Sequence, residues 1–184
     1  MLEAIATNIE GLIVLQPQRH RDSRGFFSET YNEHTASSLG ITTTWKQDNF
    51  SLSLVKGTLR GFHCQKPPKA QAKLISCSNG SIFDVAIDVR KKSSTYGQWF
   101  GIELSFENGK QMFIPEGFLH GFLTLSKNTQ VVYKCSDFYS PLHEIVVSPS
   151  NVSVDVDWPF FDELCIASKD LAGVLFKDFD SPFF

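Results

Sequence analysis

The stretch that decides the fold is Gly57–Gln65, with the sequence GTLRGFHCQ, read together with Gly109–His120, GKQMFIPEGFLH. In each stretch a glycine opens a short run that carries a histidine. His63 follows Gly57 after five intervening residues, and His120 follows Gly117 after two. The order of the two stretches, with a strand-rich region between them, indicates one β-domain with a histidine on each of two strands.

Short apolar or alternating runs recur along the chain, and Gly, Pro, Asn and Ser residues separate them. This spacing is typical of an antiparallel sandwich or barrel, so the predicted fold class is all-β. The expected strands are residues 12–15, 58–65, 72–77, 82–89, 99–104, 112–114, 121–125 and 130–134.

The clearest alternation lies between Phe83 and Val89, where every second side chain is apolar. One face of this strand is therefore expected in the core and the other in water or in a cavity wall. Asn-Gly pairs at Asn79-Gly80 and Asn108-Gly109 each predict a hairpin, because these residues readily adopt left-handed backbone angles.

Helix is scarce in the predicted secondary structure. Residues 32–39, closed by Gly40, are expected to form two turns. Ser168 is expected to cap a second short helix. The predicted apolar face of that helix consists of Leu171, Val174 and Leu175.

The length of 184 residues suits one domain, residues 1–184. Within it we expect N-terminal strands and a short helix (1–50), a barrel core (51–140) and a C-terminal segment with a short helix (160–184).

Composition excludes several classes of partner. The net charge is −3 and no block of like charge occurs, so neither a nucleic-acid partner nor a membrane surface is expected. The N-terminus has neither the basic nor the apolar region of a signal peptide, and a cytoplasmic location is expected. The four cysteines lack a C-x-x-C pair, so reduced and mostly buried thiols are expected.

The two histidine-bearing stretches resemble the sequence pattern of the cupin superfamily. That resemblance implies a jelly-roll β-barrel or sandwich with a few short peripheral helices. In metal-binding cupins the first stretch resembles His-x-His followed by Glu, whereas here Gln65 stands for the second histidine and residues 66–69 offer no carboxylate. Only His63 and His120 remain as ligand candidates, so we expect no metal and no cofactor.

Longer motifs narrow the resemblance. They are RGFHCQ (60–65), KPPKAQAKL (66–74), FDVAIDVR (83–90), IPEGFLHGF (114–122) and Tyr133-Lys134, together with DSRGFFSE (22–29), Gln47-Asp48-Asn49 and Trp158-Pro159. In order and spacing these motifs are similar to those of the dTDP-4-dehydrorhamnose 3,5-epimerase family, over about residues 11 to 170. The resemblance implies an isomerase that serves dTDP-rhamnose and polysaccharide biosynthesis.

The implied reaction inverts C3 and C5 of dTDP-4-dehydro-6-deoxy-D-glucose and gives dTDP-4-dehydro-L-rhamnose through an enolate. His63 has a side chain suited to a general base near neutral pH. By resemblance, Asp170 orients its imidazole, Lys73 stabilises the enolate oxygen and Tyr133 is the acid on the opposite face.

The resemblance also supplies binding residues. Arg24 and Arg60 are candidates for the diphosphate, which suits a guanidinium fork. Nucleotide recognition is expected from Glu29, Gln47 and Asn49, packing on the base or sugar from Phe27 and Tyr139, and the sugar pocket from Gln65 and His120. Asp84 is expected in the cavity wall as a supporting partner. The family is homodimeric, and Arg24, Phe27 and Glu29 are expected to act in the partner's site.

Two questions stay open in the sequence. Strict alternation puts Arg60 on the face opposite His63, and only a bulge at Gly61 or curvature of the strand would bring both to one site. The chain also differs from the residues usual in the family at five positions, and the last two of them are expected nearest the pocket: Phe62, Cys64, Ala72, Lys69 and Phe138.

These departures leave the sugar and the number of inverted centres open. The alternatives are a 3-only or 5-only epimerase, or a 3,4-ketoisomerase, on a related nucleotide sugar. From other classes come a metal-dependent cupin oxygenase and a non-catalytic sugar-binding cupin.

Overall fold

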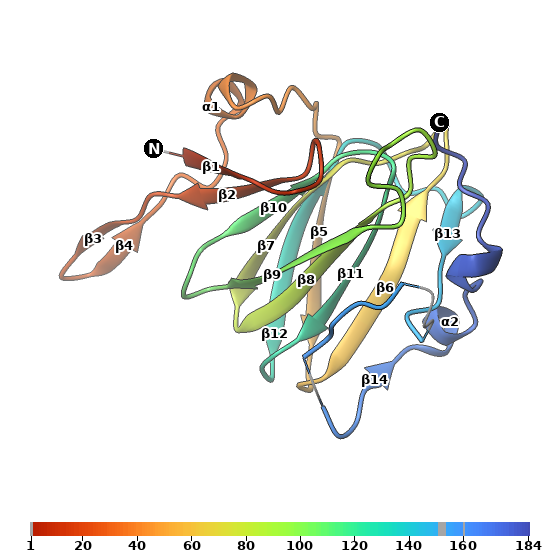
Figure 1. Ribbon diagram of the computed structural model, residues 1–184. Helices are drawn as coiled ribbons and strands as arrows, with labels where there is room; N and C mark the ends of the chain where they lie inside the picture. The colour runs from red at the N-terminus through yellow and green to blue at the C-terminus, as the bar shows by residue number, and fades with distance from the viewer. Residues whose placement is uncertain (1, 151–153, 160) are drawn as a thin grey trace.

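The computed structural model describes residues 2–150, 154–159 and 161–184, and it is dominated by two β-sheets packed face to face (Figure 1). Within these residues the first sheet has the order β1 (Leu2–Ala6), β2 (Ile13–Pro17), β10 (Gln111–Ile114), β7 (Lys73–Asn79), β12 (Thr129–Cys135) and β5 (Gln47–Ser53). The second has the order β13 (Glu144–Val146), β6 (Thr58–Gln65), β11 (Phe118–Thr124), β8 (Ser81–Asp88) and β9 (Trp99–Ser105), and β14 (Cys165–Ile166) joins β6 in parallel. The predicted all-β, cupin-type fold is confirmed.

Apolar side chains fill three layers. Between the sheets, Ile75 and Met112 of the first sheet meet Ile82 and Phe122 of the second. The outer face of the second sheet is covered by the C-terminal segment, whose Phe179 and Phe183 are buried. The outer face of the first sheet is covered by the region around α1 (Glu33–Ser38). The end of the interior that this packing leaves unfilled is where the site lies.

Both hairpin predictions are wrong. The turn at Asn79-Gly80 joins β7 to β8, and the turn at Asn108-Gly109 joins β9 to β10, but the strands in each pair belong to different sheets. Gly80 and Gly109 do have the expected positive φ angles of 76° and 64°. An Asn-Gly pair sets the local backbone angle, whereas burial of the next strand's apolar side chains decides which sheet that strand joins.

Strand β8 is buried on both faces, so of the two expectations for its second face, water or a cavity wall, water is excluded. Val85 and Ile87 pack under the C-terminal segment, and Ala86 points into the interior between the sheets. The carboxylates of Asp84 and Asp88 are both 0% exposed. Each needs a partner, because burying an unpaired charge is costly.

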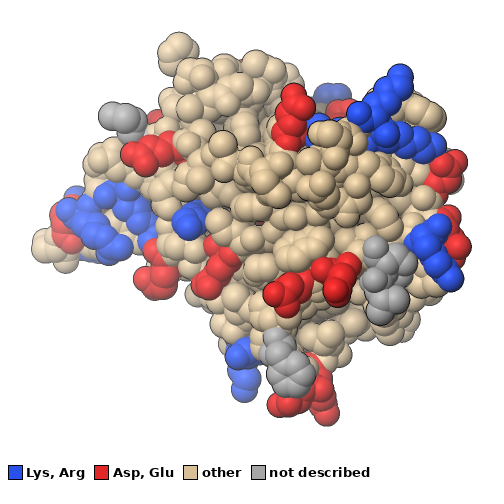
Figure 2. All heavy atoms as spheres, in the orientation of Figure 1, with Lys and Arg blue, Asp and Glu red and all other residues tan. Residues whose placement is uncertain are grey.

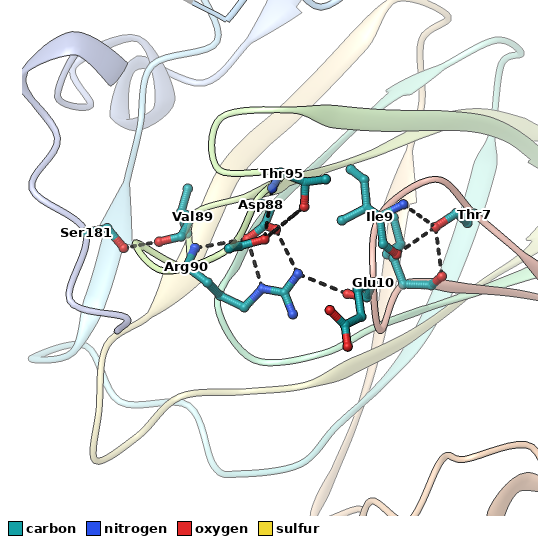
Figure 3. Close-up of polar contacts among 10 residues, drawn as sticks. Thr7, Ile9, Glu10, Asp88, Val89, Arg90, Thr95 and Ser181 are labelled. Atoms are coloured by element: carbon teal, nitrogen blue, oxygen red, sulfur yellow. Dashed lines mark hydrogen bonds and ion pairs between the residues drawn. The ribbon is translucent and has the colours of Figure 1, made fainter.

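The partner of Asp88 is Arg90, which ties distant parts of the chain together (Figure 3). Arg90 donates from Nε to Asp88 Oδ1 over 2.9 Å and from Nη2 to Oδ2 over 2.7 Å. The same Nη2 reaches the carbonyl of Glu10 in the β1–β2 turn, and Ser181 of the C-terminal tail donates to the carbonyl of Val89. Burial alone would raise the pKa of Asp88, but hydrogen bonds from Arg90, Ser93 and Thr95 outweigh it and hold the pKa at about 2.

The helices follow the sequence in one case and depart from it in the other. Helix α1 begins after Asn32, whose side chain accepts from the Thr35 amide. Helix α2 (Ser168–Leu171) is capped by Ala167 without a side-chain bond, so Ser168 is its first residue and not its cap. The predicted apolar face is also wrong, because Leu171, Val174 and Leu175 are exposed and the residue that α2 buries is Asp170. A short 3-10 helix, Phe176–Asp178, follows.

Charged side chains of both signs are interspersed on the face shown in Figure 2. Lys and Arg side chains gather at the hairpin of β3 (His20–Asp22) and β4 (Gly25–Phe27), which projects from the body (Figure 1), and again at the opposite side of the molecule (Figure 2). No helix among the described residues has both the length and the apolar character needed to cross a bilayer.

We expect Arg90→Met to lower the free energy of unfolding by about 3 kcal/mol at pH 7, because it leaves Asp88 buried without a cation. Folding depresses the pKa of Asp88, so its contribution of roughly 2 kcal/mol is complete above 3.8 and is lost as the pH falls through about 2. The difference between wild type and variant should therefore narrow in acid. Urea titrations at several pH values measure it, and Arg24→Met, which breaks only an exposed pair with Asp22, is the control. Equal effects of the two substitutions would contradict the assignment.

Candidate active site

Two adjoining cavities of about 440 and 350 Å³ open between the sheets. Four side chains line both cavities: His63, Lys73, Tyr133 and Lys169. Arg60, His120 and Asp170 complete the polar wall of the first cavity. Gln47, Asn49, Gln65 and Tyr139 line the second. The titratable groups therefore converge where the two cavities meet.

A bulge in β6 brings Arg60 and His63 to the same cavity. His63 lies opposite His120 of β11, and Arg60 lies opposite Phe122, so β6 contains one residue more than β11 between the two pairs. The extra residue falls beside Gly61, which has a φ of 119°. A Cβ atom on Gly61 would stand 2.6 Å from the Gly121 Cα, so the strands approach each other closely only because both residues are glycine.

His63 is oriented by a carboxylate from the other end of the chain. Asp170 Oδ1 lies 2.7 Å from His63 Nε2, and its Oδ2 accepts the Gly61 amide over 3.0 Å. A carboxylate accepts hydrogen bonds, so the Nε2 position carries the ring proton and Nδ1 keeps a free lone pair. Asp170 is 3% exposed, so α2 buries it for this pairing. The arrangement has the form of a base with its orienting acid.

The electrostatic surroundings keep the His63 ring neutral. Burial lowers its pKa from 6.5, and the positive charges of Lys73 and Lys169 lower it further. Asp170 opposes this shift without reversing it. A neutral imidazole at physiological pH is available to accept a proton.

Lys73 and Tyr133 come from the sheet that faces His63. Lys73 pairs with Cys135 and Tyr133 with Ile75 across β7 and β12, so the two side chains share the inner face. Burial lowers the pKa of Lys73, against the opposing effect of nearby Cys135, Cys64 and Asp84. Burial also raises the pKa of Tyr133, which keeps the phenol protonated. A base on one sheet thus faces a cation and a proton donor on the other.

A second histidine–carboxylate pair lies deeper between the sheets. His120 Nε2 is 2.7 Å from Asp84 Oδ1, and both side chains are buried. Burial raises the pKa of Asp84, and His120 and Lys73 oppose the rise. Asp84 was expected in the cavity wall, but it lines neither cavity and instead contacts His120 from behind.

The expected residues Arg24, Phe27 and Glu29 are not brought to either cavity. They belong to the projecting hairpin and the segment after it (Figure 1). Arg24 pairs with Asp22 and its side chain is 88% exposed, Phe27 is 71% exposed, and Glu29 accepts from Asn32. Within this chain they cannot contact a ligand in the cavities.

Some cavity residues were missed in the sequence. Ser51 lines the first cavity with a buried hydroxyl that has no partner among the described residues. It follows Gln47 and Asn49 at alternate positions of β5, which is a signal that would have found it. Lys169 precedes Asp170, and its ammonium lies 2.7 Å from both oxygens of Glu144 in the second cavity. Exposed Cys165 is also in the wall of the first cavity, and no motif indicates it.

A metal centre finds no support in the donor set. Across residues 2–150, 154–159 and 161–184, no three His, Cys, Asp or Glu side chains cluster in a way that could hold a metal ion. His63 and His120 lie opposite each other, but each ring already bonds a carboxylate.

Comparisons with known proteins agree on one family. A family model described as dTDP-4-dehydrorhamnose 3,5-epimerase matches residues 6–178. The dTDP-4-dehydrorhamnose 3,5-epimerase of Salmonella typhimurium is 44% identical over 176 residues, which cover 95% of this chain and 96% of that protein.

Solved structures match over the whole fold. The dTDP-6-deoxy-D-glucose-3,5-epimerase of Legionella pneumophila, in complex with dTDP-4-keto-L-rhamnose, superposes with a TM-score of 0.95 at 40% identity and covers 100% of this chain and 99% of its own. The dTDP-4-dehydrorhamnose 3,5-epimerase of Bacillus anthracis, with TDP and PPi bound, gives a TM-score of 0.92 at 41% identity over 95% of this chain and 99% of its own.

We expect the His63 ring to titrate below pH 6.5, and Asp170→Asn to lower its pKa further, because an amide no longer favours the imidazolium form. The ring signals of wild type and variant, followed by NMR against pH, measure both values. The ring signals of the exposed His34 are the internal reference for the spectra. A rise in the His63 pKa in the Asp170→Asn protein would contradict the pairing.

Proposed function

The chain belongs to the dTDP-4-dehydrorhamnose 3,5-epimerase family, and on that premise we propose that it inverts C3 and C5 of dTDP-4-dehydro-6-deoxy-D-glucose. The product is dTDP-4-dehydro-L-rhamnose, and the enzyme is an isomerase. The observation that carries the assignment of roles is the oriented, neutral His63 imidazole facing Lys73 and Tyr133 across one cavity.

His63 is the base of the proposed mechanism. The protons at C3 and C5 are acidified by the 4-keto group, since removal of either gives an enolate with its charge on O4. His63 Nδ1 takes the proton, and the new ring proton leaves an imidazolium that Asp170 stabilises through Nε2. A positioned base of this kind accelerates proton transfer by roughly 10²–10⁴-fold.

Lys73 and Tyr133 complete the reaction from the facing sheet. The Lys73 ammonium stabilises the enolate oxygen, a charge that exists only after proton removal, so its effect is on the transition state. Tyr133 donates a proton to the face of the sugar opposite His63. Solvent then reprotonates Tyr133 and takes the abstracted proton from the His63 imidazolium, so both groups are reset for the second centre. Inversion requires a proton acceptor on one face of the sugar and a proton donor on the other, and the two sheets supply one each.

Binding is assigned to the rim and the second cavity. The exposed guanidinium of Arg60 contacts the diphosphate, and the Ser51 hydroxyl, unpaired among the described residues, can donate to the same diphosphate. Tyr139 packs on the thymine ring of the substrate, with Gln47 and Asn49 beside it. His120, held by Asp84, faces the hexose.

A homodimer is part of the proposal. Arg24, Phe27 and Glu29 are exposed on a projecting hairpin and the segment after it, and they would complete the partner's cavity. Exposed Phe27 on the hairpin and Phe50 on β5 give the surface apolar area that an interface would cover. The cytoplasmic location and the lack of nucleic-acid or membrane partners stay predictions.

Inversion of both C3 and C5 is preferred over the alternative reactions, which are inversion of a single centre and 3,4-ketoisomerisation. Lys69 and Phe138, the departures expected nearest the pocket, line neither cavity; Lys69 pairs with Asp137, and Phe138 is exposed. They therefore give no reason to assign a single-centre epimerase or a ketoisomerase.

Incubation with dTDP-4-dehydro-6-deoxy-D-glucose in D₂O should place deuterium at both C3 and C5, as followed by NMR. His63→Asn should reduce the exchange by roughly 10²–10⁴-fold, whereas the exposed His34→Asn should not change it. Label at one carbon would assign a single-centre enzyme, and no label would refute the proposed function.

Arg24→Ala and His63→Ala should each be nearly inactive, but subunit exchange between them should restore activity. A mixed dimer contains one cavity with native His63 that receives native Arg24 from its partner, so random exchange returns up to about a quarter of wild-type activity. Steady-state assays of the mixture against each variant alone measure this. An additive mixture would place Arg24 in its own subunit's site or outside the reaction.

A further inference from the structure

Side-chain amides, and not strand pairing, hold the segment Asp137–Ser140 over the second cavity. Gln65 Nε2 donates to the carbonyls of Lys69 over 2.6 Å and Phe138 over 3.2 Å. Its Oε1 accepts the Ser140 amide over 2.6 Å. Gln65 itself is 4% exposed, whereas the residues that it bonds are half-buried or exposed.

Two more glutamines complete the attachment. Gln71 Nε2 donates to the carbonyl of Asp137 over 2.6 Å, and Gln47 Oε1 accepts the amide of Tyr139 over 2.8 Å. Each residue from Asp137 to Ser140 is thus bound through its backbone by a side-chain amide of β5, β6 or the connection before β7. This fixes the path of a segment that has no ladder of its own.

The three contacts of Gln65 use both of its amide protons and one lone pair of its oxygen. Little of this carboxamide is left to bind a sugar, although the side chain lies at the edge of the cavity. Its effect on a ligand therefore passes through the segment that it holds.

That segment presents Tyr139 to the second cavity, and a chain of contacts connects Tyr139 to the proposed general base, His63. The Tyr139 hydroxyl donates to Glu144 Oε2 over 3.1 Å, and Glu144 holds the ammonium of Lys169. Lys169 precedes Asp170, the partner of His63. Glu144 also lies opposite Gln65 in the β13–β6 pair, so one short region of β6 supports both ends of this chain of contacts.

We propose that Gln65 is a positioning residue that sets the place of Tyr139 and so the affinity for the nucleoside part of the substrate. The inference rests on the proposed function. Glutamine suits this role because it donates to two carbonyls and accepts from one amide. A glutamate would repel the carbonyls, and an apolar side chain would remove all three bonds from the segment.

The test compares Gln65→Met with Gln111→Met. Both replace a buried glutamine by a side chain of similar volume. Among the residues that the structure describes, the Gln111 side chain bonds only Ser76, and it lines neither of the two cavities. We expect Gln65→Met to raise KM, and the Kd for dTDP measured by calorimetry, by about 10-fold with kcat within about 3-fold. Gln111→Met should leave both constants unchanged. The milder Gln71→Met, which removes one bond to the segment from a residue that also lines the second cavity, should raise both constants about 3-fold. It serves if Gln65→Met does not fold, and the Tyr139→Ala background then separates loss of positioning from loss of direct contact.

A double-variant cycle separates positioning from general destabilisation. In a Tyr139→Ala background, Gln65→Met should weaken dTDP binding by less than about 2-fold, because the group that it positions is gone. The inference would be overturned if Gln65→Met still raised the Kd for dTDP by about 10-fold in the Tyr139→Ala background. It would also be overturned if the Kd were unchanged in both Gln65→Met and Gln71→Met. Wild-type protein that binds dTDP without exchanging deuterium would refute the proposed function and leave this comparison valid.

Discussion

The bond between His63 and Asp170 is the contact on which the rest of the site depends. The carboxylate bonds the ring and the Gly61 amide together, so it fixes the imidazole and the bulge beside it at once. That bulge in turn puts Arg60 in the cavity wall with His63, which strict alternation would forbid. The orientation of His63, the shape of β6 and the polar wall of the cavity therefore all depend on the same carboxylate. The cost of burying Asp170 is offset because both of its oxygens have partners.

Much of the fold could be predicted because the core strands bury apolar side chains at regular intervals. Residues 58–65 form β6 as expected. Strand β5 was missed for a physical reason: Gln47, Asn49 and Ser51 point toward the cavities, whereas Phe50 and Leu52 point outward, so its pattern is the reverse of a core strand. Sequence rules fail there because the strand serves the site and not the core. The two Asn-Gly turns were located correctly, yet their strands pair elsewhere, since pairing depends on burial that a turn motif does not encode.

The candidate site was only partly accessible to the same reasoning. His63 could be proposed from its own chemistry, but Asp170 came only from family resemblance, because nothing local in the sequence relates residues 107 positions apart. Lys169 and Glu144 escaped notice since each has an ordinary surface identity until folding pairs them. Gln65 was found, but as a residue for the sugar; its contacts show an amide already occupied by backbone. The position of Gln65 in a motif identified it as a site residue. Its hydrogen bonds show that it holds the segment Asp137–Ser140.

The distance along the chain between the base and its carboxylate also orders events during synthesis. Every strand of the sandwich except β14 precedes residue 147, so all the other strands are translated before Asp170 is reached. At that stage the imidazole faces the interior without the group that fixes its tautomer. In the proposed mechanism Asp170 orients the base only when α2 packs against β6, so the site is complete only in chains translated at least as far as Asp170.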